Sequence, residues 1–454
     1  MPRRYLVLAI CCMSLLIISL DVTIVNIALP AIRADLGSSV SGLQWTIDAF
    51  AVVIASLLVL SGSTADRVGR RRIFQTGLAI FTVASLLCSV APGLSWLIAF
   101  RVLQAIGASM MNPVAMSIIT NTFTEPRERA KAIGAWGAVN GFGLALGPVV
   151  GGFLVHALGW RSIFWVNVPV GVAALILTAL FVPESRAPKP RRLDPVGQIL
   201  VLVLLAGVTF AIIEGPGTGW SSPEILGCFA LGAAALAGLL WWEPRRAEPL
   251  IDLALFRGPP FSGAVLIAIC AFAALSGFLF LNTLYLQETR GLSALAAGLW
   301  TLPLAAANVL MSPVSGRLVG ARGTRLPLQL AGAGMALGML PLIWAGPDTP
   351  IWPLLLGYLV FGLGFGLVNT PITNTAVSGM PRERAGVAAA IASTSRQVGS
   401  ALGVAVIGAV LVSGSMRAGW WILFALGVAV LVLGRLSTGA WAHRRAREPV
   451  EVPA

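Results

Sequence analysis

Charged side chains are scarce in this sequence, since Asp, Glu, Lys and Arg together make up only 11% of its 454 residues. Hydrophobic residues make up 57%, and the mean hydropathy is +0.88. Both values lie far from those of soluble domains. Such a composition excludes an ordinary soluble globular protein and indicates an all-α polytopic membrane protein.

Residues that bind metals or carry out covalent chemistry are also scarce. The sequence has two histidines and five cysteines, and the cysteines lie inside apolar runs without metal-binding or disulfide spacing: Cys11, Cys12, Cys88, Cys228 and Cys270. We find no phosphate-binding loop, metal cluster or nucleophile motif. We therefore expect no metal, no cofactor and no enzymatic activity.

Basic residues are placed in a way that predicts topology. The net charge of +13 would suggest nucleic acid in a soluble protein, but here basic residues flank apolar runs of about 20 residues, the length that spans a bilayer. We therefore expect no nucleic-acid partner. The runs predict fourteen helices, starting near Tyr5, Gln44, Ile73, Leu94, Ala132, Ser162, Pro195, Ser222, Phe261, Ala294, Leu326, Ile351, Ala385 and Ala418.

The distribution of Lys and Arg tests this number of helices. In the predicted topology, 25 of the 31 basic residues lie in the termini and on one side, and four lie on the other. The positive-inside rule then places both termini in the cytoplasm. The apolar stretch after Arg3 and Arg4 runs on to about Leu29 without a clear cleavage site, so we interpret it as an uncleaved first helix.

An internal repeat divides the chain. Residues 126–130 (PRERA) recur unchanged as residues 381–385, and two other segments repeat with nearly the same offset. Such a period indicates two related six-helix halves. We expect an N-terminal half at 1–185, two inserted helices with basic linkers at 186–257, a C-terminal half at 258–440, and a cytoplasmic tail at 441–454.

A charged turn between the second and third predicted helices is the most specific motif. It reads GSTADRVGRRR over residues 62–72, and its arginines cannot lie in lipid. It resembles the signature loop of the major facilitator superfamily. That resemblance implies two six-helix bundles related by an axis along the membrane normal. It also implies a cytoplasmic gate formed by Gly62, Asp66, Arg67, Gly69, Arg70 and Arg71.

Ionisable residues inside apolar helices are the first candidates for function, because each is costly in hydrocarbon. Asp21 and Arg101 lie at similar depths, so they can pair, and a paired, buried carboxylate can exchange a proton. A purely structural ion pair is the alternative. Asp48 lies beside Trp45 and Phe50 in the sequence, an arrangement able to attract a lipophilic cation; an interfacial, water-exposed aspartate is the alternative.

The segment LDVTIVNIALP at residues 20–30 resembles the first-helix signature of the drug:proton antiporters with fourteen helices. RVLQAIG at 101–107 is similar to the helix 4 motif of that family, although Ala105 stands where glycine is usual. The resemblance implies a role in proton transfer for Arg101. A glycine-rich segment resembles the antiporter motif of helix 5, namely Gly143, Gly147, Pro148, Gly151 and Gly152. Small residues there let helices approach closely.

We interpret the chain as a proton-coupled exporter of lipophilic drugs or antibiotics in the cytoplasmic membrane. Some members of the family that the chain resembles carry an acidic residue in the tenth helix, which is associated with divalent organic cations. The tenth predicted helix here has no carboxylate, so the resemblance implies neutral or monocationic substrates. Candidate residues lining the path are Asn26, Trp45, Asp48, Phe50, Gln104, Asn140, Asn282 and Asn308. Glu214 and His156 are more readily interpreted as interfacial residues.

Two alternatives stay open. One is a proton-coupled exporter of a single endogenous metabolite, siderophore or lipid. The other is a membrane receptor or scaffold that does not transport. We expect the chain to function as a monomer. Its expected partners are lipophilic small molecules, protons and membrane lipid.

Overall fold

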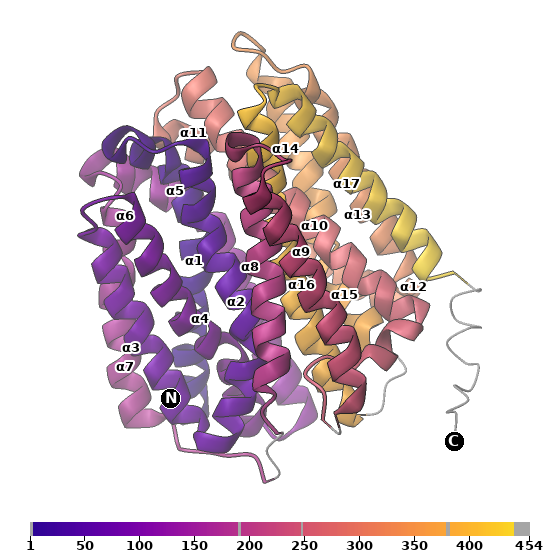
Figure 1. Cartoon of the computed structure of the whole chain (residues 1–454). Coiled ribbons are helices and arrows are strands. Elements are labelled where there is room, and N and C mark those ends of the chain that lie inside the picture. The colour runs from indigo at the N-terminus through magenta and orange to yellow at the C-terminus, as the bar shows by residue number, and fades with distance from the viewer. Residues whose placement is uncertain (1–2, 189–191, 247, 378–381, 440–454) are drawn as a thin grey trace.

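The computed structural model describes residues 3–188, 192–246, 248–377 and 382–439, without the side chains of Pro126, Ala130, Asn140 and residues 382–386. The described residues contain helices and no strands (Figure 1). Fourteen helical spans are long and apolar enough to cross a membrane. The predicted fold class and number of helices are therefore confirmed. The expected tail, 441–454, lies outside the described residues.

The N-terminal helices form one bundle, in which α6 and α7 together make the sixth span (Figure 1). Their bounds are α1 Arg3–Leu36, α2 Val40–Val68, α3 Arg70–Ser89, α4 Leu94–Thr122, α5 Pro126–Leu158, α6 Ser162–Trp165 and α7 Asn167–Phe181.

The C-terminal helices form a second bundle, in which two spans are broken. One span is interrupted at Thr301, between α11 and α12, and the other at residues 367–368, between α14 and α15. The bounds are α10 Pro259–Leu284, α11 Ala294–Trp300, α12 Leu302–Arg322, α13 Arg325–Ile343, α14 Ile351–Gly366, α15 Asn369–Val377, α16 Arg382–Val412 and α17 Met416–Ser437. A short π-helical turn, Tyr285–Thr289, extends α10.

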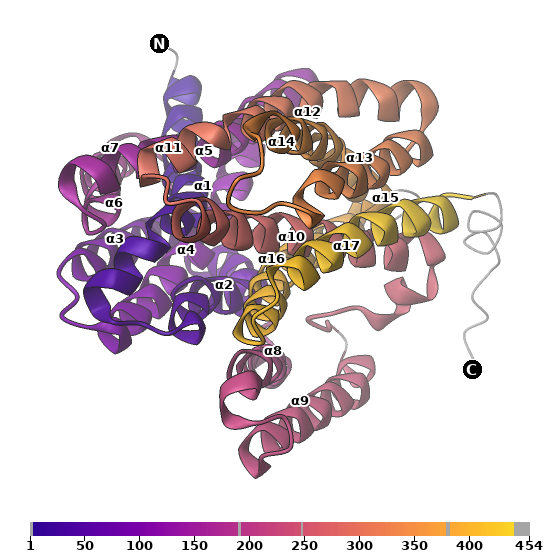
Figure 2. The ribbon, with the colours of Figure 1, turned by 90° about the horizontal axis from the view of Figure 1, so that it is seen from above.

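Two further helices, α8 (Pro195–Thr218) and α9 (Pro223–Trp242), lie outside both bundles. Seen from above, α8 lies beside α2 and α16, where the two bundles meet, and α9 lies on the outer side of α8 (Figure 2). Short helical turns at Glu243–Arg245 and Leu253–Arg257 lead from α9 into the second bundle.

Local sequence explains several helix ends. Oxygens of Ser39, Asp194 and Ser222 accept hydrogen bonds from backbone amides in the first turns of α2, α8 and α9, as capping residues do. Gly69 and Gly323 have φ of 132° and 74° and separate α2 from α3 and α12 from α13. Because side chains disfavour positive φ, glycine is required at both turns.

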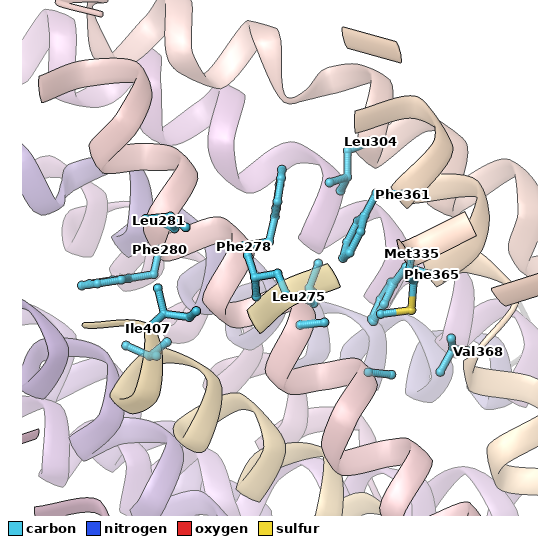
Figure 3. Packing of buried hydrophobic residues seen from close by; sticks show 14 of the residues in the cluster. Leu275, Phe278, Phe280, Leu281, Leu304, Met335, Phe361, Phe365, Val368 and Ile407 are labelled. Atoms are coloured by element: carbon cyan, nitrogen blue, oxygen red, sulfur yellow. The ribbon is translucent and has the colours of Figure 1, made fainter. Parts of the chain in front are cut away.

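The two bundles share a core at one end of the molecule. We call the end where α1 begins and α17 ends the terminal end, and the opposite one the far end (Figure 1). The largest buried cluster joins Ile24 to Ile32 of α1 with Phe278 to Leu286 of α10 and its extension. Phe278 stacks on Phe361 of α14 at 5.1 Å between ring centroids (Figure 3).

Hydrogen bonds tie the bundles together at the far end. Gln44 of α2 donates to the carbonyls of Val404 and Ala405 of α16, at 3.2 and 2.8 Å. Gln287 donates to the carbonyl of Ile27 at 2.8 Å. The structure therefore shows a conformation in which the far end is closed.

Candidate functional site

The intramembrane charges expected to pair do so in the structure. Arg101 of α4 donates from Nη1 to Oδ2 of Asp21 of α1 at 2.5 Å. The exposed fractions of the two side chains are 1% and 0%. Burial of a charge is tolerated only where the charge is paired and hydrogen-bonded. The pair therefore holds α1 and α4 together inside the first bundle.

Neutral side chains complete the bonding of Asp21. Its Oδ1 accepts hydrogen bonds from Gln104 Nε2 at 2.9 Å and from Asn167 Nδ2 at 3.0 Å. Gln104 Nε2 also donates to Ser85 Oγ at 2.8 Å, and Gln104 Oε1 accepts from Arg101 at 2.6 Å. Helices α1, α3, α4 and α7 each contribute, so we call these five residues the Asp21 cluster.

Sequence reasoning missed Asn167 and Ser85. Asn167 is the first residue of α7 and is followed by a long apolar run. The available signal was a lone amide within an apolar run, because such a group needs an internal partner in the membrane.

Arg101 also contacts the second helix. Its Nε donates to the carbonyl oxygen of Thr46 at 3.1 Å. Its guanidinium lies over the ring of Phe50, 4.2 Å from the centroid. Such stacking stabilises the positive charge of an arginine side chain that is buried away from water. Arg101 thus connects the carboxylate of α1 to the backbone of α2, a helix that also bonds to the second bundle through Gln44.

A cavity of about 210 Å³ lies between the two bundles. Its polar lining comes from both: Ser19, Thr23, Asn26, Arg101, Asn112, Trp136, Ser276, Asn369, Ser393, Arg396, Gln397 and Ser400. Apolar side chains that include Phe50, Phe272 and Leu275 complete it. A mostly apolar cavity with a few polar groups is the usual form of a small-molecule site.

Residues predicted around Asp48 lie in different places. Phe50 faces Arg101 and the cavity, whereas Trp45 donates to Glu214 Oε1 of α8 at 2.7 Å. Asp48 is fully buried, and its oxygens have no hydrogen-bond partner. It lies one turn from Gln44 and one turn from Val52, both of which pack against α16, so it shares their face of α2.

The predicted asparagines also separate. Asn26 lines the cavity, and Asn308 lines a small neighbouring space beside Thr23. Asn282 accepts a hydrogen bond from Tyr358 at 2.5 Å and lies buried within the second bundle. The side chain of Asn140 lies outside the described part of the chain. Asn112, which lines the cavity, was not among the sequence candidates.

The charged turn between α2 and α3 is anchored to its own bundle. Arg70 donates from Nε and Nη2 to Asp66 Oδ1 at 3.0 and 2.9 Å. Glu184, which follows α7, accepts from the backbone amide of Arg71 at 3.0 Å, and the Arg71 side chain donates to the carbonyl of Ala179 at 2.7 Å. These contacts fix the start of α3 against the end of α7.

The glycines of α5 let two other helices come close. A Cβ atom at Gly143 or Gly151 would lie 2.6 Å from side-chain atoms of α1, and one at Gly147 would lie 2.8 Å from Thr23 Cβ. A Cβ atom at Gly152 would lie 2.5 Å from the carbonyl oxygen of Ala294 and 2.8 Å from Leu295 Cα, on α11. The motif therefore packs α5 against α1 of its own bundle and against α11 of the second bundle.

Within the described ranges, no cluster of three or more His, Cys, Asp or Glu side chains could hold a metal ion. His156 is exposed. The arrangement offers instead one buried carboxylate bonded to an arginine.

Comparisons with known proteins agree on one family. The family model described as Major Facilitator Superfamily matches residues 11–404. The multidrug resistance protein Stp of Mycobacterium tuberculosis is 37% identical over 88% of this chain and 74% of its own length. The methylenomycin A resistance protein of Streptomyces coelicolor is 37% identical over 87% of this chain and 83% of its own.

The drug efflux pump JefA of M. tuberculosis is 33% identical over 91% of this chain and 81% of its own. Among solved structures, a POT family transporter in complex with a thioalcohol-conjugated peptide superposes with a TM-score of 0.69 over 94% of both chains, at 15% identity. At this identity the likeness concerns the fold.

Proposed function

Because this chain belongs to the Major Facilitator Superfamily, and is therefore a multi-pass transporter of the cell membrane and not an enzyme, we propose that it exports lipophilic drugs or antibiotics in exchange for protons. Relatives that match most of the chain are named multidrug resistance, antibiotic resistance and drug efflux proteins. The observation that carries the proposal is the Asp21 cluster beside a cavity between the two bundles.

Proton exchange takes place at Asp21. In the conformation described, Asp21 accepts hydrogen bonds from Arg101, Gln104 and Asn167. Arg101 also donates to the carbonyl oxygen of Thr46, which fixes its position. When α2 moves relative to α1, the Thr46 carbonyl moves with it. Arg101 is then drawn from Asp21, which lowers the cost of protonating the carboxylate.

The two bundles, residues 1–185 and 258–440, rock about the cavity as units. With the termini in the cytoplasm, as the positive-inside rule favours, the closed far end faces outward. In this proposal the conformation described is closed toward the outside. A substrate shifts the equilibrium between inward and outward states only through a difference in affinity for them.

Members of this family generally need no cofactor, since an ion gradient drives transport, and they act on small molecules within lipid. We propose that this chain likewise uses the proton gradient alone and works as a monomer without nucleic acid, because each chain encloses its own path.

Growth of an efflux-deficient bacterial host tests export directly. We expect the parent to raise the minimum inhibitory concentrations of several unrelated lipophilic antibiotics several-fold over the empty vector. A rise for one compound alone would favour a dedicated metabolite exporter. No rise for any compound, with the protein present in the membrane, would contradict drug export.

The charged turn supplies a separate prediction, for Asp66→Asn. The change removes the negative charge from the acceptor of two hydrogen bonds from Arg70, so that the bonds are no longer between charged groups. Because the pair is partly exposed, we expect it to shift the ratio of inward to outward conformers by up to about fivefold, or about 1 kcal/mol. Spin labels at Gly134 of α5 and Gly316 of α12, in a variant lacking the native cysteines, would measure this ratio.

Asp348→Asn is the control, because that carboxylate is exposed in the far loop between α13 and α14. The latch role of Asp66 fails if Asp66→Asn, like the control, leaves both the distance distribution and the transport rate unchanged.

A further inference from the structure

The cavity between the bundles contains an arginine whose charge is not balanced. Arg396 of α16 and Arg101 of α4 both line it, from opposite bundles. Asp21 balances Arg101 at 2.5 Å. In the described part of the chain, Arg396 forms no ion pair, and its Nη2 donates to Thr373 Oγ1 at 2.6 Å.

The rest of the Arg396 side chain is poorly bonded. Its Nε is buried without a hydrogen-bond partner, and the guanidinium lies 6.0 Å from the ring centroid of Phe272. A guanidinium has five N–H donors and no acceptor. Leaving a buried donor unpaired is unfavourable, so the group is prepared to bind an acceptor that enters the cavity.

The other lining residues select the charge of that acceptor. No Asp or Glu is among the described residues that line the cavity. Asp21 lies behind Arg101 with 0% exposure, and Asp48 is not part of the lining. The cavity therefore carries the positive charge of Arg396, and in a site of low dielectric this charge repels a cation.

A second donor lines the cavity from the first bundle. Trp136 Nε1 of α5 is buried without a partner and belongs to the cavity lining. Apolar surface from Phe50, Phe272 and Leu275 surrounds these polar groups. Together they fit a molecule with an apolar, aromatic body and one oxygen acceptor group.

From this geometry we propose that the cavity binds lipophilic organic acids, whose carboxylate or phenolate oxygen bonds to Arg396 while the aromatic body packs between Phe50 and Phe272. The inference rests on the proposed export function and names its substrate class. It differs from the expectation of neutral or monocationic substrates, because that expectation used only the absence of a carboxylate in the tenth predicted helix. In this proposal the substrate binds Arg396 and the proton binds Asp21. Movement of the substrate is then coupled to movement of the proton through the conformational change of the protein.

Competition binding with three matched naphthalenes tests the proposal. Labelled 1-naphthaleneacetate is bound to the purified full chain in lipid nanodiscs at neutral pH. Unlabelled 1-naphthaleneethanol and 1-naphthylmethylammonium then compete as the neutral and cationic matches. For the parent we expect the acid to bind about tenfold more tightly than the alcohol, as expected for about 1.4 kcal/mol of added interaction, and the ammonium to bind most weakly.

Three variants locate the preference. Arg396→Gln should reduce the preference for the acid to within about twofold of the alcohol, the loss of a charge-assisted bond. Arg396→Lys should keep part of it, because the positive charge is retained. Arg435→Gln, which changes an exposed arginine of the same bundle, should leave it unchanged.

The proposal is overturned if the parent does not bind the acid, binds acid and alcohol equally, or keeps its preference in Arg396→Gln. This failure is distinguishable from failure of export. A parent that confers drug resistance without preferring the acid contradicts only the substrate class. If the parent prefers the acid but confers no resistance, the export function is contradicted, whereas the proposed binding site still stands.

Discussion

Asp21→Asn is expected to abolish proton-coupled transport while leaving the protein folded. Asparagine retains an oxygen that accepts from Gln104 and Asn167, but it removes the negative charge beside Arg101. A buried charge left without its partner costs about 3–5 kcal/mol. That cost lowers stability, whereas coupling is lost because a carboxamide cannot take up and release a proton; we therefore expect proton-coupled transport to fall by about two orders of magnitude or more.

Two variants separate coupling from a structural role. Asp35→Asn is the matched control, because Asp35 also lies on α1 and pairs with an arginine, Arg161, at 2.6 Å, but is exposed; we expect little effect. The double variant Asp21→Asn with Arg101→Gln removes both charges, so it should regain thermal stability without regaining coupling. Recovery of transport in the double variant would show that the pair is structural.

Gly152→Ala is expected to oppose closure of the far end. The added Cβ would lie 2.5 Å from the carbonyl oxygen of Ala294 and 2.8 Å from Leu295 Cα. Both are backbone atoms, so no side chain can rotate away. Overpacking of this kind costs about 1–3 kcal/mol, and we expect a five- to 150-fold shift away from the closed far end. Spin labels at Ser39 and Ser413, in the far-end segments, would measure it.

Gly137→Ala is the control on the same helix, because no atom lies within 4 Å of the added Cβ. It should leave the label distances unchanged and slightly favour the helix. If Gly152→Ala gave the same distances and the same transport as Gly137→Ala, the close approach of α5 and α11 would not set the conformational equilibrium.

The helices could be predicted from sequence because apolar runs and basic flanks determine where a chain crosses a membrane. Helix starts agree with the prediction to within six residues. The largest difference is at α5, which begins at Pro126 and not near Ala132. Arg127, Arg129 and Lys131 mark the membrane boundary, but the helix continues beyond it, where Glu125 accepts hydrogen bonds from the amides of Arg127 and Glu128.

The site could be predicted only in part. Asp21 and Arg101 could be paired because their depths follow from their distance along each helix. Which face of each helix points to the cavity could not be predicted, since lipid-facing and core-facing surfaces are both apolar. Asn282 therefore could not be distinguished from a cavity residue, although it bonds to Tyr358. For the same reason the charge imbalance at Arg396 becomes visible only once the cavity is assembled.

Drug-driven proton movement in proteoliposomes is the most direct test of the central claim, that Asp21 exchanges the proton that drives export. The parent and Asp21→Asn would be reconstituted with a pH-sensitive dye, and lipophilic compounds that the parent exports from cells would be added. The account predicts proton movement in the parent for several compounds and none in Asp21→Asn. Equal proton movement in the two proteins, or none in the parent, would contradict it.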